Sequence, residues 1–238
     1  ARVVNLALGG NLRHKLYRSR TKVRSALIQA VRRVHCQPSA MVGPSPRMAA
    51  FCGGFRSIVT FNYDVTLDWM MNDANGAFGG NWFKDGFIGP SRTFDPTWRR
   101  LYRPIAPVPG ATMVFFGHGS LVLGQDLNGR EYKITNPPPT AGTFPDLLNT
   151  VFDEWKHRRT VPLFVSEGSK ADKLRSVRRS GYLSTVYDDV LSKCGAAVAV
   201  YGFSFGASDE HVVDAFERAA PRYIAVSVYT GMPVYEQQ

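Results

Sequence analysis

The stretch from Phe55 to Asp64, which reads Phe-Arg-Ser-Ile-Val-Thr-Phe-Asn-Tyr-Asp, most constrains what this chain can fold into. Its run of β-branched and aromatic residues predicts a short buried strand, and the polar residues Thr60, Asn62 and Asp64 come at its carboxyl end. In open α/β sheets, ligands bind at that end of the strands. The segment therefore predicts a strand that delivers polar side chains to a crevice.

Two later segments repeat this design. The first is Met113 to Gly119, Met-Val-Phe-Phe-Gly-His-Gly, and the second is Val198 to Ser204, Val-Ala-Val-Tyr-Gly-Phe-Ser. Each predicts an apolar strand that ends on small or polar residues. Because parallel strands end at the same edge of a sheet, we expect the three segments to converge on one crevice.

The rest of the chain alternates between expected helices and strands. Helices are expected at residues 17–35, 48–55, 65–71, 145–158, 169–191 with a break at Gly181, and 209–219, and further strands at 161–165 and 223–229. Leu121 to Ile134 predicts a hairpin that turns at Asn128-Gly129, and Ser169 with Asp172 predicts a capping box. This alternation favours one α/β domain over residues 1–238, with a parallel sheet and right-handed crossovers.

Proline and glycine clusters mark the expected loops, which include residues 37–47, 72–80 and a turn at Gly9-Gly10-Asn11. The stretch 82–109 is rich in both aromatic residues and prolines. Such a segment is too irregular for one regular element and too aromatic for a linker. It predicts a lid or flap within an insertion over residues 72–110, and an ordinary loop with a small satellite core is the alternative.

Composition excludes several classes of protein. A hydrophobic fraction of 44% in 238 residues is typical of a globular domain. The longest apolar runs are too short to cross a bilayer, so no membrane partner and a cytoplasmic location are expected. The three cysteines, Cys36, Cys52 and Cys194, are scattered and form no Cys-x-x-Cys pair. We therefore expect neither a disulfide framework nor a zinc ribbon, and no metal site.

Positive charge is concentrated at the start of the chain. Residues 1–63 hold 11 Lys and Arg and no Asp or Glu, whereas the remaining residues hold 18 Lys and Arg against 19 Asp and Glu. Such an excess suggests nucleic acid, the phosphates of a nucleotide, or a surface that faces an acidic part of the same protein. Few aromatic side chains are interleaved with these arginines, which counts against nucleic acid.

Three strand ends carry groups suited to chemistry. The Asn62 carboxamide can orient a sugar hydroxyl or a water, or it can simply form a turn. Asp64 can accept a hydrogen bond from a ligand or cap the next helix. His118 lies between Gly117 and Gly119, and an unshielded imidazole that titrates near neutral pH is suited to general base catalysis.

The third strand end, Gly202-Phe-Ser-Phe-Gly206, combines the Ser204 hydroxyl with small residues, and Asp209 begins the next helix. Such features favour binding of phosphate or ribose. Its Gly-x-Ser-x-Gly spacing also matches a serine nucleophile elbow, but an elbow enters its helix directly after the serine. A serine hydrolase is therefore only a minor alternative.

In this order, Thr60-Phe-Asn-Tyr-Asp64, Gly117-His-Gly119 and Tyr201-Gly-Phe-Ser204 followed by Asp209 resemble the sirtuin-like NAD-binding superfamily, and in particular its bacterial, defence-associated branch. The resemblance implies a three-layer, Rossmann-like parallel sheet flanked by helices. It also implies that Asn62 and His118 are catalytic, and that NAD is the substrate. The NAD-binding residues implied in this way are Thr60, Phe61, Asp64, Gly117, Gly119, Gly202, Ser204 and Asp209.

The implied reaction is cleavage of the nicotinamide–ribose bond of NAD, which releases nicotinamide and ADP-ribose, with antiviral defence by NAD depletion as its setting. Two departures from the family pattern matter. The glycine-rich phosphate loop is not matched, so we expect it upstream of residue 1 in a truncated chain. Without zinc-binding cysteines, NAD hydrolysis or ADP-ribosyl transfer is favoured over deacylation. A binding module that senses NAD or ADP-ribose without turnover is the main alternative, and a homo-oligomer is left open.

Overall fold

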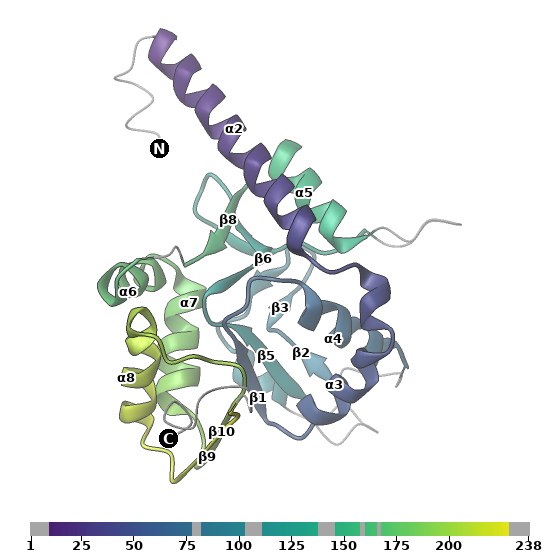
Figure 1. Ribbon diagram of the computed structural model, residues 1–238, viewed down its shortest axis with the longest axis vertical. Coiled ribbons are helices and arrows are strands. Elements are labelled where there is room, and N and C mark those ends of the chain that lie inside the picture. The colour runs from purple at the N-terminus through teal and green to yellow at the C-terminus, as the bar shows by residue number, and fades with distance from the viewer. Residues whose placement is uncertain are drawn as a thin grey trace.

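The computed structural model describes residues 10–77, 82–102, 111–137, 146–157, 160–165 and 168–228 (Figure 1). It is a mixed α/β fold, which confirms the expected class. The helices are α2 (Gly10–Val34), α3 (Pro44–Cys52), α4 (Thr66–Ala77), α5 (Leu147–His157), α6 (Lys170–Arg178), α7 (Gly181–Thr185) and α8 (Glu210–Ala219). Short helical turns are η1 (Pro38–Met41), η2 (Trp98–Tyr102), η3 (Val186–Val190), η4 (Leu191–Lys193) and η5 (Ala207–Asp209).

The described strands form three sheets. The strands are β1 (Ser57–Thr60), β2 (Phe83–Lys84), β3 (Phe87–Ile88), β4 (Thr93–Phe94), β5 (Thr112–Phe116), β6 (Gly119–Gln125), β7 (Glu131–Lys133), β8 (Val161–Phe164), β9 (Ala197–Val200) and β10 (Tyr223–Val226). One sheet is parallel with the order β1-β5-β2, and a second is the parallel pair β10-β9. The third has the order β3-β4-β7-β6-β8 and is antiparallel.

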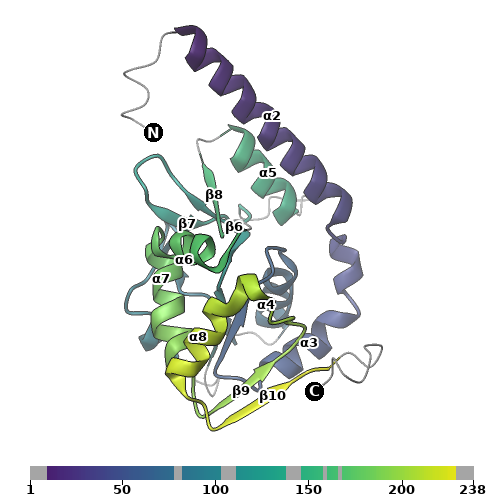
Figure 2. The ribbon, with the colours of Figure 1, turned by 60° about the vertical axis from the view of Figure 1, so that its left-hand side comes forward.

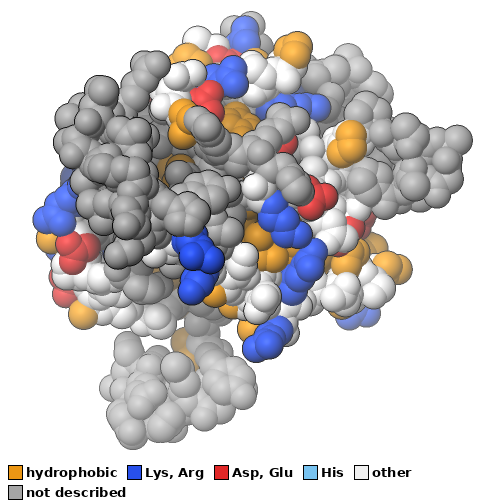
Figure 3. Space-filling model, turned by 90° about the horizontal axis from the view of Figure 1, so that it is seen from above, with side chains coloured by type: hydrophobic (Ala, Val, Ile, Leu, Met, Phe, Trp, Pro, Cys, Tyr) orange, Lys and Arg blue, Asp and Glu red, His pale blue; other side chains and the backbone are white. Residues whose placement is uncertain are grey.

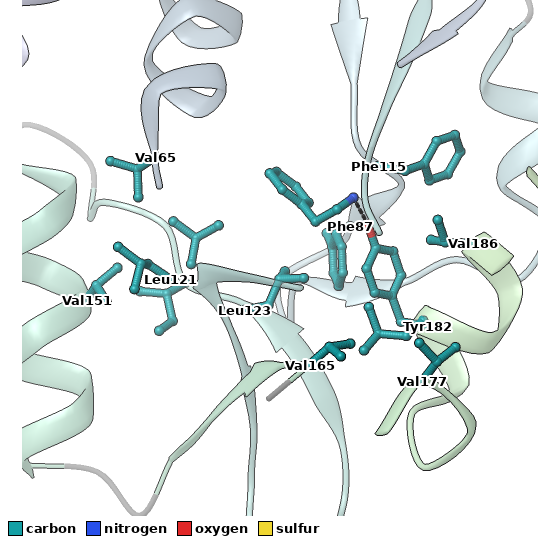
Figure 4. Close-up of a cluster of buried hydrophobic side chains, with 14 of the residues drawn as sticks. Val65, Phe87, Phe115, Leu121, Leu123, Val151, Val165, Val177, Tyr182 and Val186 are labelled. Carbon is teal, nitrogen blue, oxygen red and sulfur yellow. Dashed lines mark hydrogen bonds between the residues drawn. The ribbon is translucent and has the colours of Figure 1, made fainter. Parts of the chain in front are cut away.

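The hydrophobic core is built around β5 and β6. All five residues of β5 are buried, which is typical of a strand covered on both faces. The ring of Tyr182, at the start of α7, packs against Phe87 and Phe94, and its hydroxyl accepts a hydrogen bond from the backbone N–H of Phe116 at 2.8 Å (Figure 4). On the other side of the core, Val151 of α5 packs among the same buried cluster. The Tyr182 contacts hold the end of β5 against α7, and Val151 brings α5 into the same core.

Local sequence signals explain several element boundaries. Ser169 and Asp172 form the expected capping box at the start of α6. The expected break at Gly181 separates α6 from α7. The hairpin of β6 and β7 turns at Gly129, whose φ is +83°, and the Asp126 carboxylate accepts hydrogen bonds from backbone N–H groups in this turn. These predictions are confirmed.

Other boundaries differ from the expectation. Residues 37–47, expected as a loop, contain η1 and the first turn of α3, because Pro44 suits the first position of a helix. Gly10 begins α2 instead of forming a turn, and Gly9 lies outside the described residues. The loop expected from residue 72 is helical as far as Ala77, where the described residues end, because Asn75 bonds both the N–H and the carbonyl of Phe83 and ties α4 to β2.

The aromatic stretch does not form a separate flap over the residues that the structure describes. β2 pairs with β5 inside the parallel sheet, and β3 and β4 belong to the antiparallel one. The side chains of Phe83, Phe87 and Trp98 are buried in the core. Within residues 82–102, these aromatic side chains therefore pack into the core of the domain. Residues 78–81 and 103–110 of the expected insertion 72–110 lie outside the described part.

The expectation of one parallel sheet is also corrected in part. β8 was expected to join a parallel sheet, but it runs antiparallel to β6. The parallel strands β9 and β10 pair with each other, and α8 lies beside them in Figures 1 and 2. Of the helices in the described ranges, none combines the length and the apolar character that a membrane-crossing helix requires.

Candidate functional site

The site begins where β1 and β5 end side by side. The two strands are parallel, with Thr60 opposite Phe116. Just beyond this pair the backbone N–H of Gly117 donates to the Thr60 carbonyl at 2.8 Å. The polar segment after β1 and the Gly-His-Gly segment after β5 therefore share one edge of the sheet, as the sequence predicts.

The ring of Phe61 joins three segments that are far apart in the chain. Its centroid lies 4.7 Å from that of the His118 ring and 5.1 Å from that of Phe203. A Cβ atom on Gly117 would lie 2.6 Å from the Phe61 ring, so only glycine leaves room for this contact. The exposed residues Asn62 and Ser204 directly follow Phe61 and Phe203. The predicted convergence of the three strand ends is confirmed at the level of these segments.

The expectation of an unshielded His118 imidazole is wrong, because this side chain is buried and pairs with a second histidine. Its exposed fraction is 4%, and its Nε2 atom lies 2.9 Å from Nε2 of His211 in the first turn of α8. The two rings differ in plane by only 20°, and their centroids are 5.1 Å apart. Since the two nitrogens are much closer than the centroids, the rings meet edge to edge through one hydrogen bond.

A carboxylate and an ammonium group complete the cluster. The Asp209 carboxylate lies 3.8 Å from His118 Nε2 and accepts a hydrogen bond from Lys173 Nζ at 2.8 Å. Lys173 comes from α6 and is itself buried. The paired charges of Asp209 and Lys173 thus offset each other beside the two imidazoles.

The environment keeps both histidines neutral. The pKa of His118 is lowered from its ordinary 6.5 to about 4, mainly by burial and also by the nearby His211 and Lys173, whereas Asp209 acts in the opposite direction. Burial likewise lowers the pKa of His211, with Asp209, Asp214 and the Ser208 backbone acting against it. At neutral pH, the cluster therefore contains two uncharged imidazoles that share one proton between their Nε2 atoms.

His118, His211 and Asp209 are also the types of residue that bind zinc, and one ligand atom of each lies within 4.8 Å of the others. In this structure the two Nε2 atoms share a hydrogen bond, and Lys173 donates to one oxygen of Asp209. A cation bound here would replace the shared proton of the two imidazoles.

The structure gives several predicted residues a local structural partner. Thr60 accepts a hydrogen bond from the Asn62 backbone N–H at 3.1 Å, and Asp64 accepts one from the Thr66 N–H at 2.9 Å at the start of α4. The capping interpretation of Asp64 is thereby supported. Gly119 has a φ of +85°, and a Cβ there would lie 2.1 Å from the Leu163 carbonyl oxygen. The backbone conformation and the close carbonyl at this position therefore require glycine.

The loop after β9 is only partly as predicted. Gly202 has a φ of +63°, and its N–H donates to the Ser227 hydroxyl at 3.0 Å. Ser204 is exposed. Asp209 stands at the cap position of α8, but its side chain forms no capping hydrogen bond and binds Lys173 instead. Its carboxylate therefore belongs to the histidine cluster.

Sequence reasoning missed two members of this cluster, His211 and Lys173. His211 follows the predicted helix start at Asp209 by two residues, which places it in the first turn, but nothing local indicates that it reaches His118, 93 positions earlier. Lys173 lies in an ordinary amphipathic helix after the capping box. Only the packing of α6 and α8 against each other reveals either role.

Two surface hollows lie outside this cluster. One, of about 740 Å³, is lined by residues that include Arg92, Asn136 and Glu154, and the other, of about 540 Å³, by residues that include Asp126 and Arg130. Neither contains a residue of the candidate site.

These features define an α/β protein with a neutral histidine pair where two parallel strands end. Comparison with known protein families identifies the family to which the chain belongs. Residues 2–238 match the model of the family described as a domain of unknown function, DUF4917, and the chain belongs to that family. No curated protein matches the chain.

Proposed function

We propose that this protein hydrolyses NAD at the nicotinamide–ribose bond, with Asn62 and His118 as its catalytic residues. The observation that carries the proposal is the contact of Phe61 with both His118 and Phe203, because it brings all three predicted segments to one place. The resemblance to the sirtuin-like superfamily supplies the substrate. In this proposal, Asn62 orients the ribose or the attacking water.

The chemistry suits a neutral imidazole. Nicotinamide leaves as an uncharged group, so the reaction needs no strong acid; it needs stabilisation of an oxocarbenium-like state and a base for the nucleophile. With its pKa lowered to about 4, His118 remains in the proton-accepting form throughout the neutral range. An attacking water or ribose hydroxyl can then transfer its proton to the ring as the new bond to the sugar forms.

Aromatic side chains give the site a surface for a flat ring. Phe61 contacts Phe203, and Phe203 in turn contacts Phe205, with ring centroids 5.0 Å apart. The Phe205 side chain is partly exposed. Nicotinamide and adenine are both planar aromatic groups, and stacking on such rings is favourable. We assign this run of rings to the binding of one base of NAD.

The same proposal includes the finer fold. We propose that β1-β5-β2 and β10-β9 are two parts of one Rossmann-like layer, with the phosphates of NAD near the loop from Gly202 to Asp209. Support comes from the parallel direction within each part and from the contact between Phe61, after β1, and Phe203, after β9. The cytoplasmic NAD pool would be the substrate, and its depletion would be the route to a defence role.

The near-complete burial of His118 favours a second candidate, a module that binds NAD or ADP-ribose without turnover. Calorimetry separates the two candidates. Saturable binding of NAD with no nicotinamide formed would support the sensor. Nucleic acid is less well supported as a partner. Arg18, Lys22 and Arg32 of α2 are exposed, but the basic side chains visible in Figure 3 are interspersed with acidic and hydrophobic ones.

The test is nicotinamide release from NAD by the full-length protein, measured by chromatography. We expect His118→Ala to reduce the rate by roughly 10²- to 10⁴-fold, the usual contribution of a general base. Asn62→Ala is expected to reduce it by roughly 10²-fold, as for loss of an orienting polar group. Asn72→Ala, an exposed asparagine on α4, is the matched control and should leave the rate unchanged.

Two results would overturn the proposal. The first is nicotinamide release that is equal in the wild type, His118→Ala and Asn62→Ala, since the site would then be elsewhere. The second is a folded wild-type protein that binds NAD in calorimetry and releases no nicotinamide, which would leave the sensor as the function.

A further inference from the structure

We infer that His118, His211 and Asp209 together form a binding site for a divalent cation of the Zn²⁺ type, and that a cation bound there takes His118 out of the proposed reaction. Among the residues that the structure describes, these three are the one set of zinc-type donors close enough to share an ion, with one ligand atom of each within 4.8 Å of the others. The binding part of this inference stands on geometry. Its consequence for nicotinamide release rests on the proposed function.

The two imidazole nitrogens already lie almost at the spacing of a zinc site. Nε2 of His118 and Nε2 of His211 are 2.9 Å apart, and the ring planes differ by only 20°. In a tetrahedral site, Zn–N bonds of about 2.0–2.1 Å place two ligand nitrogens roughly 3.3 Å apart. A shift of roughly 0.4 Å, which is within ordinary thermal displacement, therefore opens the pair to the width that an ion needs.

Asp209 supplies the third ligand. Its Oδ1 atom lies 3.8 Å from His118 Nε2, and it precedes His211 by two residues at the start of α8. The Lys173 ammonium donates to that same oxygen. A carboxylate has lone pairs on both oxygens, so it can hold Lys173 and an ion at once. Two histidines and one carboxylate, with a water in the fourth position, are a ligand set that zinc takes in proteins.

The surroundings keep the two imidazoles in the form that binds metal. A histidine ligand must be neutral, and burial lowers the pKa of both His118 and His211 below the ordinary value. The two side chains are only 4% and 1% exposed, so few waters compete for their nitrogens. A cation entering the cluster therefore has to replace only the proton that the two Nε2 atoms share.

Lys173 limits how tightly such an ion binds. Its ammonium is buried and lies 2.8 Å from Asp209, so a divalent cation would share the carboxylate with a fixed positive charge. Like charges this close repel each other strongly away from bulk water. We therefore expect a reversible site that fills when the concentration of free zinc rises, and not a permanently loaded centre.

An ion in this site would block the proposed base. The bond from His118 Nε2 to the metal uses a lone pair of the ring, and the added positive charge disfavours protonation of the ring as a whole. Nicotinamide release should therefore fall as the site fills, and a chelator should restore it. Mg²⁺ and Ca²⁺ should neither bind nor inhibit, because these hard cations prefer sites made of oxygen atoms.

Titration of the full-length protein with Co²⁺ and Zn²⁺ tests the site without turnover. Co²⁺ is a coloured probe, because its visible absorption is much stronger in a four-coordinate site than in the hydrated ion. We expect one equivalent of Co²⁺ to produce that absorption and Zn²⁺ to remove it, since Zn²⁺ binds such ligands more tightly. In calorimetry, His118→Ala and His211→Leu should each weaken Zn²⁺ binding by more than the roughly 10- to 100-fold typical of a residue that only supports a ligand.

Two aspartates of α8 give a matched control. Asp209 binds Lys173 and Asp214 binds Lys170, so each connects α8 to a lysine of α6. Asp209→Asn should weaken Zn²⁺ binding by about 10-fold or more, whereas Asp214→Asn should leave both binding and nicotinamide release unchanged. Lys173→Gln should strengthen binding by about 10-fold or more, because the competing charge is removed. Thermal unfolding checks that each variant is folded, and Zn²⁺ should raise the unfolding temperature of the wild type but not of His118→Ala.

The outcomes separate this inference from the proposed function. A wild type that binds no Zn²⁺ would overturn the inference, and so would equal Zn²⁺ binding by the wild type and by folded His118→Ala and His211→Leu, since other histidines or thiols would then be the ligands. Histidine-dependent binding by a wild type that releases no nicotinamide supports the site and contradicts the proposed function. Histidine-dependent binding with undiminished release would keep the site but overturn its inhibitory role.

Discussion

The phenol oxygen of Tyr182 accepts a hydrogen bond from the backbone N–H of Phe116 at 2.8 Å, two residues before His118. This bond connects α7 to the end of β5 in the interior. Tyr182 is fully buried, and burial raises the pKa of its hydroxyl well above its ordinary value, so it stays protonated. The position of His118 therefore depends on a side chain that belongs to a different part of the chain.

Removing this hydroxyl should loosen the strand end. Tyr182→Phe leaves the Phe116 N–H buried without a partner, and we expect the free energy of unfolding to fall by about 1–3 kcal/mol, the cost of an unpaired buried donor. Urea denaturation measures this change in the free energy of unfolding. Tyr201→Phe is the matched control, since the side chain of Tyr201 is 84% exposed. An equal, small loss in both variants would show that the bond contributes nothing.

The sequence indicates most elements of this fold but not their pairing. Amphipathic spacing and caps are local, so α6, the hairpin of β6 and β7, and the strand ending at Thr60 are found from a few neighbouring residues. The direction of β8 is not local. An apolar run of four residues reads the same whether it joins a parallel or an antiparallel sheet. Its direction is decided by pairing with β6, where Gly119 lies opposite Phe164 and Gln125 opposite Val161.

Lys133 lies between the carboxylates of Asp68 and Asp85 in the interior. The two carboxylates raise the pKa of Lys133 against the effect of burial. Lys133→Met leaves two buried carboxylates close together, so we expect the free energy of unfolding to fall by about 3–5 kcal/mol, as for a broken buried ion pair.

The matched control for Lys133 is Arg130→Met, which removes an exposed pair with Asp126. That change should cost less than about 1 kcal/mol, as for surface ion pairs. Chemical denaturation of both variants measures the difference. Similar losses in the two variants would contradict a special role for the buried triad.

Gly119 and Gly129 separate two effects of glycine. Both have a positive φ, of +85° and +83°, but an added Cβ meets the Leu163 carbonyl at 2.1 Å only in Gly119. Gly129→Ala should cost about 1–2 kcal/mol, the penalty for a left-handed backbone. Gly119→Ala adds a clash with the backbone next to His118, so it should cost more and should also reduce nicotinamide release. Thermal unfolding and the release assay test this pair, and equal costs would show that the backbone yields at no penalty.

The sequence predicts the residues at each strand end of the candidate site, but not which residues from elsewhere in the chain contact them. Gly117 and Gly119 flank His118 and make it recognisable in the sequence. A positive φ or a close contact with a neighbouring segment requires glycine, and glycine is visible as a local signal. His211 leaves no such signal, since its role depends on how α8 packs 93 residues later. Polar groups whose partners are remote in sequence are therefore the part of a site that local patterns miss.

Metal removal should leave the activity unchanged. The two Nε2 atoms share one proton and Lys173 donates to Asp209, and the proposed reaction requires no cation in the cluster. We expect dialysis against a chelator to have no effect on nicotinamide release, and added Zn²⁺ to inhibit by competing for the imidazoles. Loss of activity on chelation, with recovery on adding Zn²⁺, would instead make the cluster a metal centre.

The histidine cluster should also make stability depend on pH in a defined window. Above pH 6.5, His118 is neutral in both the folded and the unfolded chain. As the pH falls from 6.5 to about 4, the unfolded chain binds a proton that the folded protein does not, so the free energy of unfolding decreases by roughly 1 kcal/mol per pH unit for each such proton. Burial lowers the pKa of His211 as well, which acts in the same direction.

Carboxylates whose pKa is lowered in the folded protein lose their contribution at lower pH. The hydrogen bond from Thr97, for example, lowers the pKa of Asp95 below its ordinary 3.8, so its effect lies outside this window. Urea denaturation at a series of pH values from 7 to 4 measures the slope. His118→Gln should reduce this slope, because one of the two titrating histidines is gone, while the slope below pH 4 remains. A wild type whose stability is constant between pH 6.5 and 4 would show that the imidazoles are free to charge in the folded protein.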